Sequence, residues 1–294
     1  MRPSAVIPDG PFRLAMGLQA LKLDAWIDAD ADLAADLREK RRLLAERPGE
    51  VLAALPESAE AQREALDLLA EHLPRRFPDL YRFASGGLHV VPLGETVPLD
   101  AALAPIDAAG RLVQEDLCLM QADAAGDYCL TAASLCFPSR WRLAEKVGKP
   151  LAAIHAPVPG YDAALAKPVD RFFALLKADK PVERSNWSVY DDPALFQPCG
   201  HGRKAPDPTL TSENAGVRLW LRAERQTLRR LPRTGAVLFT IRIHRWTLDA
   251  AVADRRDAAA LLDLVRTLPP ELALYKSMPA IRAPLEAFLA RRAS

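Results

Sequence analysis

The chain has 294 residues, half of them apolar and 26% charged, which is the composition and length of a globular protein that buries a core. The 39 lysines and arginines nearly balance the 38 aspartates and glutamates, so the formal net charge of +1 indicates neither a nucleic-acid nor an anionic-membrane partner. The sequence has no apolar run that could span a bilayer, no secretory signal and no Cys-x-x-Cys among its four cysteines. We therefore expect a cytoplasmic protein whose cysteines are buried free thiols.

The first part of the chain, residues 1–80, carries helical patterns. Leucines at helical spacing between Asp32 and Pro48 predict one helix. Ser58 is placed to cap a second helix, which we expect to end before Pro74, because proline lacks the amide that a helix interior requires. This part of the chain is therefore predicted to form a helical segment that packs on the core.

Short strands with turns between them are predicted over residues 86–138. Residues 88–91 form a short apolar run that is typical of a strand. Two further runs, 117–120 and 128–131, flank a turn signal at Gly126. Glycine permits the positive φ of tight hairpin turns, so these two runs are predicted to form a hairpin.

The next stretch is expected to contain a stiff loop between two helices. A short helix is predicted to end near Gly148, and two prolines and a glycine follow His155. Proline fixes the backbone, so we expect a rigid, extended loop over residues 154–161. A helix over about 162–177 follows it, and Pro168 inside that pattern predicts that the helix starts or kinks there.

The clearest alternation of apolar and polar residues is found in two runs, 217–224 and 237–244. Period-two alternation is typical of strands with one buried face. Pro232 and Gly235 lie between the runs and predict a turn, so we expect an antiparallel pair. The second face of the first run carries Trp220, Arg222, Glu224 and Gln226, followed by Arg229 or Arg230.

This arginine-rich face has two interpretations. A solvent-facing strand with scattered ion pairs would produce the same pattern, and the pattern alone favours that interpretation. Arginine is, however, the residue whose planar fork pairs with carboxylates and phosphates. The alternative hypothesis is therefore that the face forms a platform for an anionic ligand.

The order of these elements predicts the fold class. The C-terminal part of the chain has helical patterns at residues 251–268, 273–276 and 284–292. Helices, strands and again helices indicate an α+β fold with a mainly antiparallel sheet. We expect one compact unit with an N-terminal helical segment (1–80), a core (81–250) and C-terminal helices (251–294). The sequence has neither a Gly-x-Gly-x-x-Gly fingerprint nor a phosphate-binding Gly-Lys-Ser/Thr loop.

Histidines offer the best candidates for chemistry, although no pair of the five has the spacing of a zinc site. His155 lies between an apolar run and a rigid Pro-Val-Pro segment. A neutral imidazole on a stiff backbone suits a haem iron, which requires one nitrogen at a fixed approach. The alternative is a buried, hydrogen-bonded histidine, which the local context alone favours. His201, between Gly200 and Gly202, is expected to be solvated.

A set of short motifs gives the sequence a family resemblance. They are Gln-Glu-Asp-Leu at 114–117, Phe-Pro-Ser-Arg-Trp at 137–141, Lys-Val-Gly at 146–148, Ile-His-Ala-Pro-Val-Pro at 154–159, Arg-Ser-Asn-Trp at 184–187 and Glu-Arg-Gln-Thr-Leu-Arg-Arg-Leu-Pro at 224–232. With Met-Gly-Leu at 16–18 and Trp-Ile at 26–27, this ordered set resembles the haem-dependent oxidative N-demethylase family. Its haem subunit removes a methyl group from dimethylamine.

The resemblance implies a PAS-like fold in which haem b lies on the antiparallel sheet between flanking helices. His155, in the matching motif, would ligate the haem iron. His244 is a second histidine on the predicted sheet and could compete as a ligand. Arg222, Arg225 and Arg229 would pair with the haem propionates, which are carboxylates.

The resemblance also implies a monooxygenase reaction. Reduced haem iron activates O2, one methyl group of a secondary amine is oxidised, and formaldehyde and methylamine are released. Electrons come from NADPH through a partner chain that carries flavin and an iron–sulfur cluster, because this sequence has no motif for those cofactors. The alternative is a non-catalytic haem-binding PAS-like sensor. A sensor usually carries an output domain, and the resemblance leaves no segment for one, so we expect the enzyme.

The amine would need an acidic or aromatic partner close to the haem. Glu224 lies beside the arginines, and Trp187 and Tyr190 lie on a run expected to border the same sheet. An aromatic face holds a methylated ammonium group with about 0.5–2 kcal/mol. The alternatives are a structural ion pair of Glu224 with Arg222 or Arg225, and ordinary core packing of the two rings.

Overall fold

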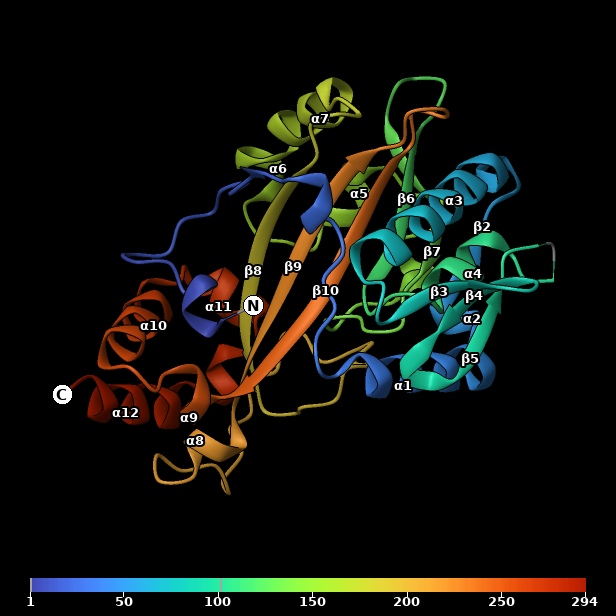
Figure 1. Ribbon diagram of the computed structural model, residues 1–294. Helices are drawn as coiled ribbons and strands as arrows, with labels where there is room; N and C mark the ends of the chain where they lie inside the picture. Colours follow the sequence, from blue (N-terminus) through green and yellow to red (C-terminus); the bar gives the residue numbers. More distant parts are fainter. Residues whose placement is uncertain (1, 101) are drawn as a thin grey trace.

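The computed structural model describes residues 2–100 and 102–294 and is built around a seven-stranded antiparallel sheet (Figure 1). In spatial order its strands are β1 (Gln19–Ala20), β8 (Val182–Tyr190), β9 (Trp220–Arg230), β10 (Val237–Thr247), β6 (Asp116–Ala122), β7 (Tyr128–Ser134) and β2 (Leu52–Ala54). A smaller antiparallel sheet contains β3 (Tyr81–Ala84), β4 (Gly87–Val90) and β5 (Glu95–Pro98). Since β1 and β2 come from the N-terminal part of the chain, that part forms both edges of the large sheet.

Helices cover the sheet and its edges (Figure 1). Their bounds are α1 (Leu33–Glu46), α2 (Pro48–Val51), α3 (Ala59–Arg76), α4 (Pro105–Gly110), α5 (Leu151–His155), α6 (Tyr161–Ala164), α7 (Ala166–Leu175), α8 (Ala215–Arg218), α9 (Leu248–Ala251), α10 (Arg255–Thr267), α11 (Pro270–Tyr275) and α12 (Arg282–Ala293). Short 3-10 turns are Pro3–Ala5, Leu23–Ala25, Pro56–Ser58, Val91–Leu93, Leu143–Glu145 and Met278–Ala280. Within the described residues, none of these helices has both the length and the apolar character that a membrane span requires.

The central strands are buried on both faces, as alternate residues of β6 demonstrate. Leu117 and Leu119 belong to a core with α1, α3 and α4, whereas Cys118 and Met120 belong to a core with Phe173 of α7. The outer strands β8 and β9 pack against α10 and α12 in a third core (Figure 1). The alternation in these strands therefore separates two apolar layers, and α1 contributes leucines to both of them.

The α+β class and the main strand pairings are confirmed. The run at 237–244 is part of β10, and the run at 217–224 is part of β9 from Trp220 on; the two strands pair antiparallel over their whole length. The strand prediction is wrong for Val217 and Arg218, which belong to α8. The predicted hairpin at 117–131 is formed by β6 and β7. A PAS-like fold stays a prediction, as does the division at residues 80 and 250.

Two details of the predicted helix at residue 58 are wrong. The helix α3 continues to Arg76 and includes Pro74, because a proline in the last turn removes only one backbone hydrogen bond. Ser58 occupies the position before the helix, but its side chain does not cap it. Its hydroxyl instead bonds Gln62 and the carbonyl group of Leu55.

The predicted extended loop at 154–161 is also wrong in its first residues. His155 is the last residue of α5, and the turn begins only after it. The next helix is divided into α6 and α7 at Leu165, three residues before Pro168. Pro168 lies in the first turn of α7, where its missing amide needs no partner. The proline thus accompanies the start of a helix, as predicted, without being the break itself.

A buried ion pair joins α1 to the central sheet. The side chain of Lys40 is fully buried, donates to two backbone carbonyl groups just before β6, and lies 3.9 Å from the carboxylate of Asp116. Asp116 also accepts hydrogen bonds from the backbone amides of Cys136 and Phe137, each at 2.8 Å. Burial raises the pKa of Asp116 to about 6, although Lys40 opposes this shift. The charge of Lys40 therefore keeps Asp116 ionised inside the core.

Replacing Lys40 should destabilise the protein strongly. Lys40→Met leaves Asp116 buried without its cation, which should lower the free energy of unfolding by roughly 3–5 kcal/mol at pH 8. The loss should shrink near pH 5, because protonation neutralises Asp116 below its raised pKa. Urea denaturation at both pH values measures the effect. The control is Arg38→Met, at an exposed position of the same helix, which should change the free energy of unfolding by less than about 0.5 kcal/mol. Equal stability of the two variants would contradict the prediction.

Candidate functional site

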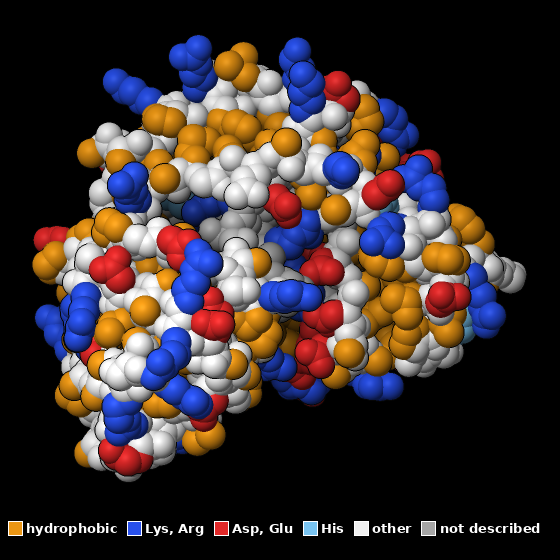
Figure 2. Space-filling model, turned by 60° about the vertical axis from the view of Figure 1, so that its left-hand side comes forward, with side chains coloured by type: hydrophobic (Ala, Val, Ile, Leu, Met, Phe, Trp, Pro, Cys, Tyr) orange, Lys and Arg blue, Asp and Glu red, His pale blue; other side chains and the backbone are white. Residues whose placement is uncertain are grey.

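A cavity of about 710 Å3 lies on one face of the large sheet and has the size of a small-molecule site. Its floor consists of side chains from β9, β10 and β6, namely Arg222, Glu224, Gln226, Leu228, Phe239, Ile241, Cys118 and Met120. Parts of residues 5–19, α5, α6, α7 and α11 form its walls. Figure 2 shows this side of the molecule hollowed between an upper and a lower lobe, with Lys and Arg side chains inside the hollow.

The lining of the cavity changes from polar to apolar along the strands. On β9 the sequence Arg222, Glu224, Gln226, Leu228 points into the cavity, because alternate strand residues share a face. The apolar end also contains Met120, Leu130, Phe172, Phe173, Phe239 and Ile241. The polar end also contains Arg140, Arg184, Tyr190, His201 and Lys276. The cavity can therefore hold a ligand that has a large apolar body and charged groups.

His155 lines this cavity at the end of α5. Its Nδ1 lies 2.9 Å from the carbonyl oxygen of Leu151, and its ring stacks on Tyr161 with centroids 4.4 Å apart. A carbonyl group only accepts, so Nδ1 carries the hydrogen and Nε2 keeps its lone pair. Burial lowers the pKa of His155 to about 4, so the ring is neutral at pH 7. The structure thus holds a neutral imidazole, oriented by its Nδ1 bond, as metal-binding histidines are.

Arg184 of β8 is a cation on the cavity wall without a protein partner. It is half-buried, and no hydrogen bond or ion pair of its guanidinium group is found in the described part of the chain. Its Nε is fully buried, and burial lowers the pKa of the guanidinium. A buried charge without a partner is costly, and a carboxylate ligand would offset that cost. Sequence reasoning missed Arg184 as a site residue, although it belongs to the Arg-Ser-Asn-Trp motif.

Arg222 lies at the cavity floor, but its donors are already used. Its guanidinium group bonds the hydroxyl of Ser139 and four backbone carbonyl oxygens, at distances of 2.9–3.3 Å. These carbonyl groups belong to Phe137, Pro138, Ala194 and Leu195. The side chain is buried and satisfied, so the geometry gives Arg222 the role of fixing two loops against β9.

Arg225 and Arg229 are not brought to the cavity. Arg225 pairs with Glu183 at 2.7 Å and donates to backbone carbonyl groups at Ala25 and Trp26. The guanidinium of Arg229 lies 4.3 Å from the ring centroid of Trp26. Both arginines occupy odd positions on β9, so strand alternation turns them away from the face that carries the even-numbered Arg222 and Glu224. A propionate contact by either residue stays a prediction that this placement does not support.

The three residues predicted to bind the amine all contribute to the cavity lining, but the register of β8 and β9 places Trp187, opposite Ala223, on the other face of the sheet from Glu224. Glu224, Trp187 and Tyr190 all line it. Glu224 accepts a hydrogen bond of 2.7 Å from Gln226, and within the described residues it forms no ion pair, so the predicted structural pair with an arginine is absent there. The ring of Tyr190 has the guanidinium of Arg140 at 4.0 Å from its centroid.

The prediction that His201 is solvated is wrong. The ring is partly buried, lines the cavity, and stacks on Tyr275 with centroids 4.1 Å apart. Its Nδ1 lies 2.7 Å from the carbonyl oxygen of Tyr275. The flanking glycines correctly indicate a loop, but only the contact with the C-terminal part of the chain, 74 residues away, brings His201 to the site.

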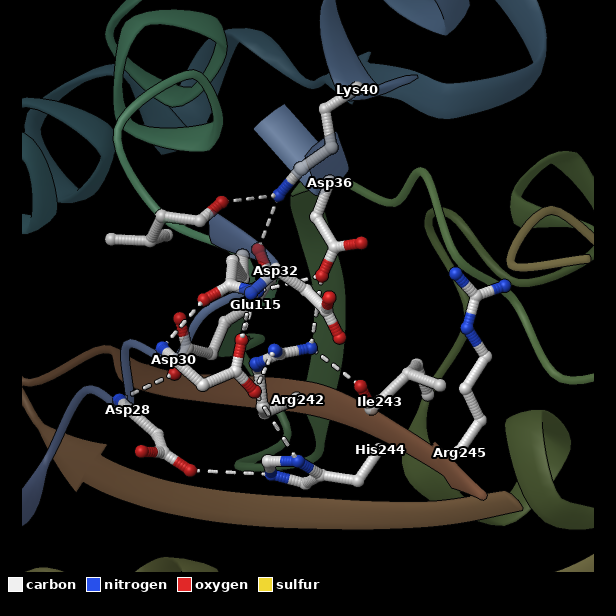
Figure 3. Close-up of polar contacts among 12 residues, drawn as sticks. Asp28, Asp30, Asp32, Asp36, Lys40, Glu115, Arg242, Ile243, His244 and Arg245 are labelled. Carbon is white, nitrogen blue, oxygen red and sulfur yellow. Dashed lines mark hydrogen bonds and ion pairs between the residues drawn. The ribbon is translucent and has the colours of Figure 1, made fainter. Parts of the chain in front are cut away.

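His244 lies in a charged network on the opposite face of the sheet (Figure 3). Its Nε2 is 3.3 Å from Asp28, and its Nδ1 is 3.8 Å from Asp30. Arg242 is beside it and pairs with Asp30 at 2.7 Å and Asp36 at 3.3 Å. Hydrogen bonding to His244 lowers the pKa of Asp28 to about 2. His244 is not part of the cavity lining, so the geometry does not bring it to the same site as His155.

A comparison with known families decides the relationship of this chain. The family described as haem-dependent oxidative N-demethylase, alpha subunit-like, matches residues 17–285. The chain belongs to this family. The match includes every strand of the large sheet and each cavity residue from Gly17 to Lys276. The family name indicates a haem-dependent oxidoreductase and an alpha subunit that works with other components.

The residues that line the cavity of this oxidative N-demethylase family member fit a haem group. Iron binds a neutral imidazole nitrogen, and Nε2 of His155 is such a donor. Propionates are carboxylates, and Arg184 is a cation without a protein partner in the described chain. The apolar residues of the lining suit a porphyrin ring. His155, on α5, would ligate the iron at the centre of the group, and Arg184, on β8, would pair with a propionate at its edge.

A variant of Arg222 should separate its structural role from the predicted propionate contact. Arg222→Met leaves the carbonyl groups of Phe137, Pro138 and Leu195 without this donor, while Ala194 keeps its bond from Gln197, so we expect the free energy of unfolding to fall by about 3 kcal/mol or more. Arg222→Lys, with three donors, should recover only part of this loss. Thermal or urea unfolding of the haem-free protein measures it, with Arg218→Met at an exposed site as the control. Unchanged stability together with weaker haem binding would restore the propionate interpretation.

Proposed function

We propose that the cavity binds haem b, with Nε2 of His155 as an iron ligand and Arg184 as the partner of a propionate. The observation that carries this proposal is the hydrogen bond from Nδ1 of His155 to Leu151, which orients a neutral ring on the cavity of a chain from a haem-dependent family. The unpartnered Arg184 supports it independently. A PAS-like description of the sheet is part of the same proposal.

We further propose that the chain is the catalytic haem subunit of a monooxygenase. Its substrate would be a small secondary amine, with dimethylamine expected, and its products methylamine and formaldehyde. Bound haem would supply the oxygen chemistry, with O2 as co-substrate. The electrons would come from NADPH through a separate reductase chain with flavin and an iron–sulfur cluster. The alpha-subunit wording of the family name supports a partner chain, and four free cysteines support the cytoplasmic location.

The polar end of the cavity supports an amine as the substrate. Glu224 offers a carboxylate that no cation of the described residues neutralises directly. Trp187 and Tyr190 offer aromatic faces, and both already have a cationic side chain over their rings. Glu224 would hold the ammonium group by charge, and the two rings would surround its methyl groups. The apolar floor beyond Gln226 would leave the methyl carbon next to the haem and away from water.

Haem binding should depend on both His155 and Arg184. His155→Ala should lose or greatly weaken haem while the protein stays folded. Arg184→Ala should bind haem about tenfold or more weakly, because a charge-assisted hydrogen bond contributes roughly 1.5–3 kcal/mol. Haem titration followed at the Soret band measures both. His89→Ala and Arg82→Ala, in the small sheet, are the matched controls. Wild-type spectra and affinities for both cavity variants would rule out this assignment.

The amine should be held by Glu224. Glu224→Gln keeps the shape but removes the charge, so the dissociation constant of dimethylamine should rise about tenfold or more. The measurement is a dimethylamine titration of haem-loaded protein by absorption, repeated with Trp187→Ala and Tyr190→Phe. Glu213→Gln, at an exposed position, serves as the control. Identical titrations for wild type and all three cavity variants would place the amine elsewhere.

The reaction itself distinguishes an enzyme from a haem sensor. With O2 and a chemical reductant, the haem-loaded protein should convert dimethylamine to equal amounts of formaldehyde and methylamine. A protein that binds haem and carbon monoxide but forms neither product would be a haem-binding protein without this activity.

A further inference from the structure

Lys276 brings an amino group to the cavity within reach of the charge of Glu224. It directly follows α11, and its side chain lines the cavity. Its Nζ donates to the carbonyl oxygen of Trp187 at 2.6 Å and lies 5.4 Å from the centroid of the Trp187 ring. Lys276 is therefore fixed next to the aromatic residue that the proposed amine would contact.

The charges around Lys276 leave it without a direct counter-ion. Within the described residues no carboxylate forms an ion pair with its Nζ. Glu224 on β9 is the acid whose field acts on it, and Arg184 on β8 is the opposing cation. His201 and Tyr275 also face this region, and burial lowers the pKa of His201 and raises that of Tyr275 to about 12. Burial lowers the pKa of Lys276 to about 8, so about a tenth of the side chain is a free amine at pH 7.

The substrate chemistry requires a proton acceptor. A secondary amine is an ammonium ion at neutral pH, and its nitrogen has no lone pair until a proton leaves. Of the groups on this wall, Arg184 stays charged, and His201 is a much weaker base than an amine. Tyr275 holds its proton at neutral pH. A lysine whose pKa is lowered toward the working pH is the type of group that enzymes use as a general base.

We propose that Nζ of Lys276 accepts the proton that the bound secondary ammonium must lose before oxidation. This inference rests on the proposed function and adds a residue to it. In the step, one N–H bond of the ammonium breaks, one N–H bond forms at Nζ, and no electrons are gained or lost. The positive charge moves from the substrate to Lys276, and Glu224 stays close enough to stabilise it in both positions.

The proposal fixes the sign of the pH dependence. Lys276 accepts a proton only in its neutral form, so kcat/KM for dimethylamine should rise with pH and level off above about 8. The affinity for dimethylamine should follow the same curve and be about tenfold weaker at pH 7 than at pH 9, since one pH unit below a pKa leaves about a tenth of a base neutral. The affinity is read from the haem spectrum and does not depend on turnover.

Two variants separate a base from a structural lysine. Lys276→Gln keeps a donor for the Trp187 carbonyl group but cannot accept the proton, so kcat should fall by about 100-fold, within the range of general-base effects, and the inflection near pH 8 should disappear. Lys276→Cys treated with 2-bromoethylamine restores an amine that is slightly less basic than lysine. It should regain activity, with its inflection at lower pH. Wild type treated in the same way controls for the exposed Cys199.

The outcomes distinguish this inference from the proposed function. Wild type that binds haem but forms no formaldehyde overturns the proposed function and, with it, the inference. If the wild type is active and Lys276→Gln keeps the same pH profile, the inference is overturned but the proposed function is not. The inference is also overturned if Lys276→Gln binds haem normally but loses activity, and the aminoethylated variant does not restore it. Lys276 would then have a structural role and not act as a base.

Discussion

The guanidinium group of Arg222 is the interaction on which the shape of the cavity depends. Burying a cation costs several kcal/mol unless its donors are satisfied, and here one hydroxyl and four backbone carbonyl groups satisfy them. The carbonyl groups come from two loops, at 137–138 and 194–195, which are also joined just beyond these residues by a backbone hydrogen bond from Arg140 to Gln197. Because both loops are fixed against β9, Arg140 and Tyr190 are held as one wall of the cavity, with the Arg140 guanidinium over the Tyr190 ring.

Charged residues on the two faces of the sheet differ in how completely they are paired. On one face, Arg242 and His244 are surrounded by Asp28, Asp30 and Asp36 (Figure 3), and their role is to join the N-terminal segment to β10. On the cavity face, Arg184 and Lys276 have no carboxylate in direct contact within the described chain. A buried charge without a partner is costly to the fold and is typical of functional sites, so this contrast favours the cavity face as the candidate site.

The sequence predicted the parts of this protein that depend on local pattern. Alternation in the two long runs predicted β9, β10 and their pairing, and it placed Glu224 on the face of the sheet that lines the cavity. The same alternation places Arg225 and Arg229 on the other face, but grouping all arginines of one motif obscured that signal. His201 and Lys276 could not have been placed, because each reaches the cavity through a contact with a residue more than 70 positions away. Such contacts follow from tertiary packing, which no single-sequence pattern records.

The segment before β1 gives the cavity one wall that contains little regular secondary structure. Between its 3-10 turn at Pro3–Ala5 and β1, it crosses the cavity and is held by a few contacts, such as the bond from the Phe12 amide to Thr267. Substitutions in this N-terminal segment would change the volume and polarity of the cavity without disturbing the sheet, the helices or Arg222. The fold thus separates the residues that give the cavity its frame from a segment that can change its lining, which gives an evolving lineage, or an engineer, a place to alter what the cavity accepts.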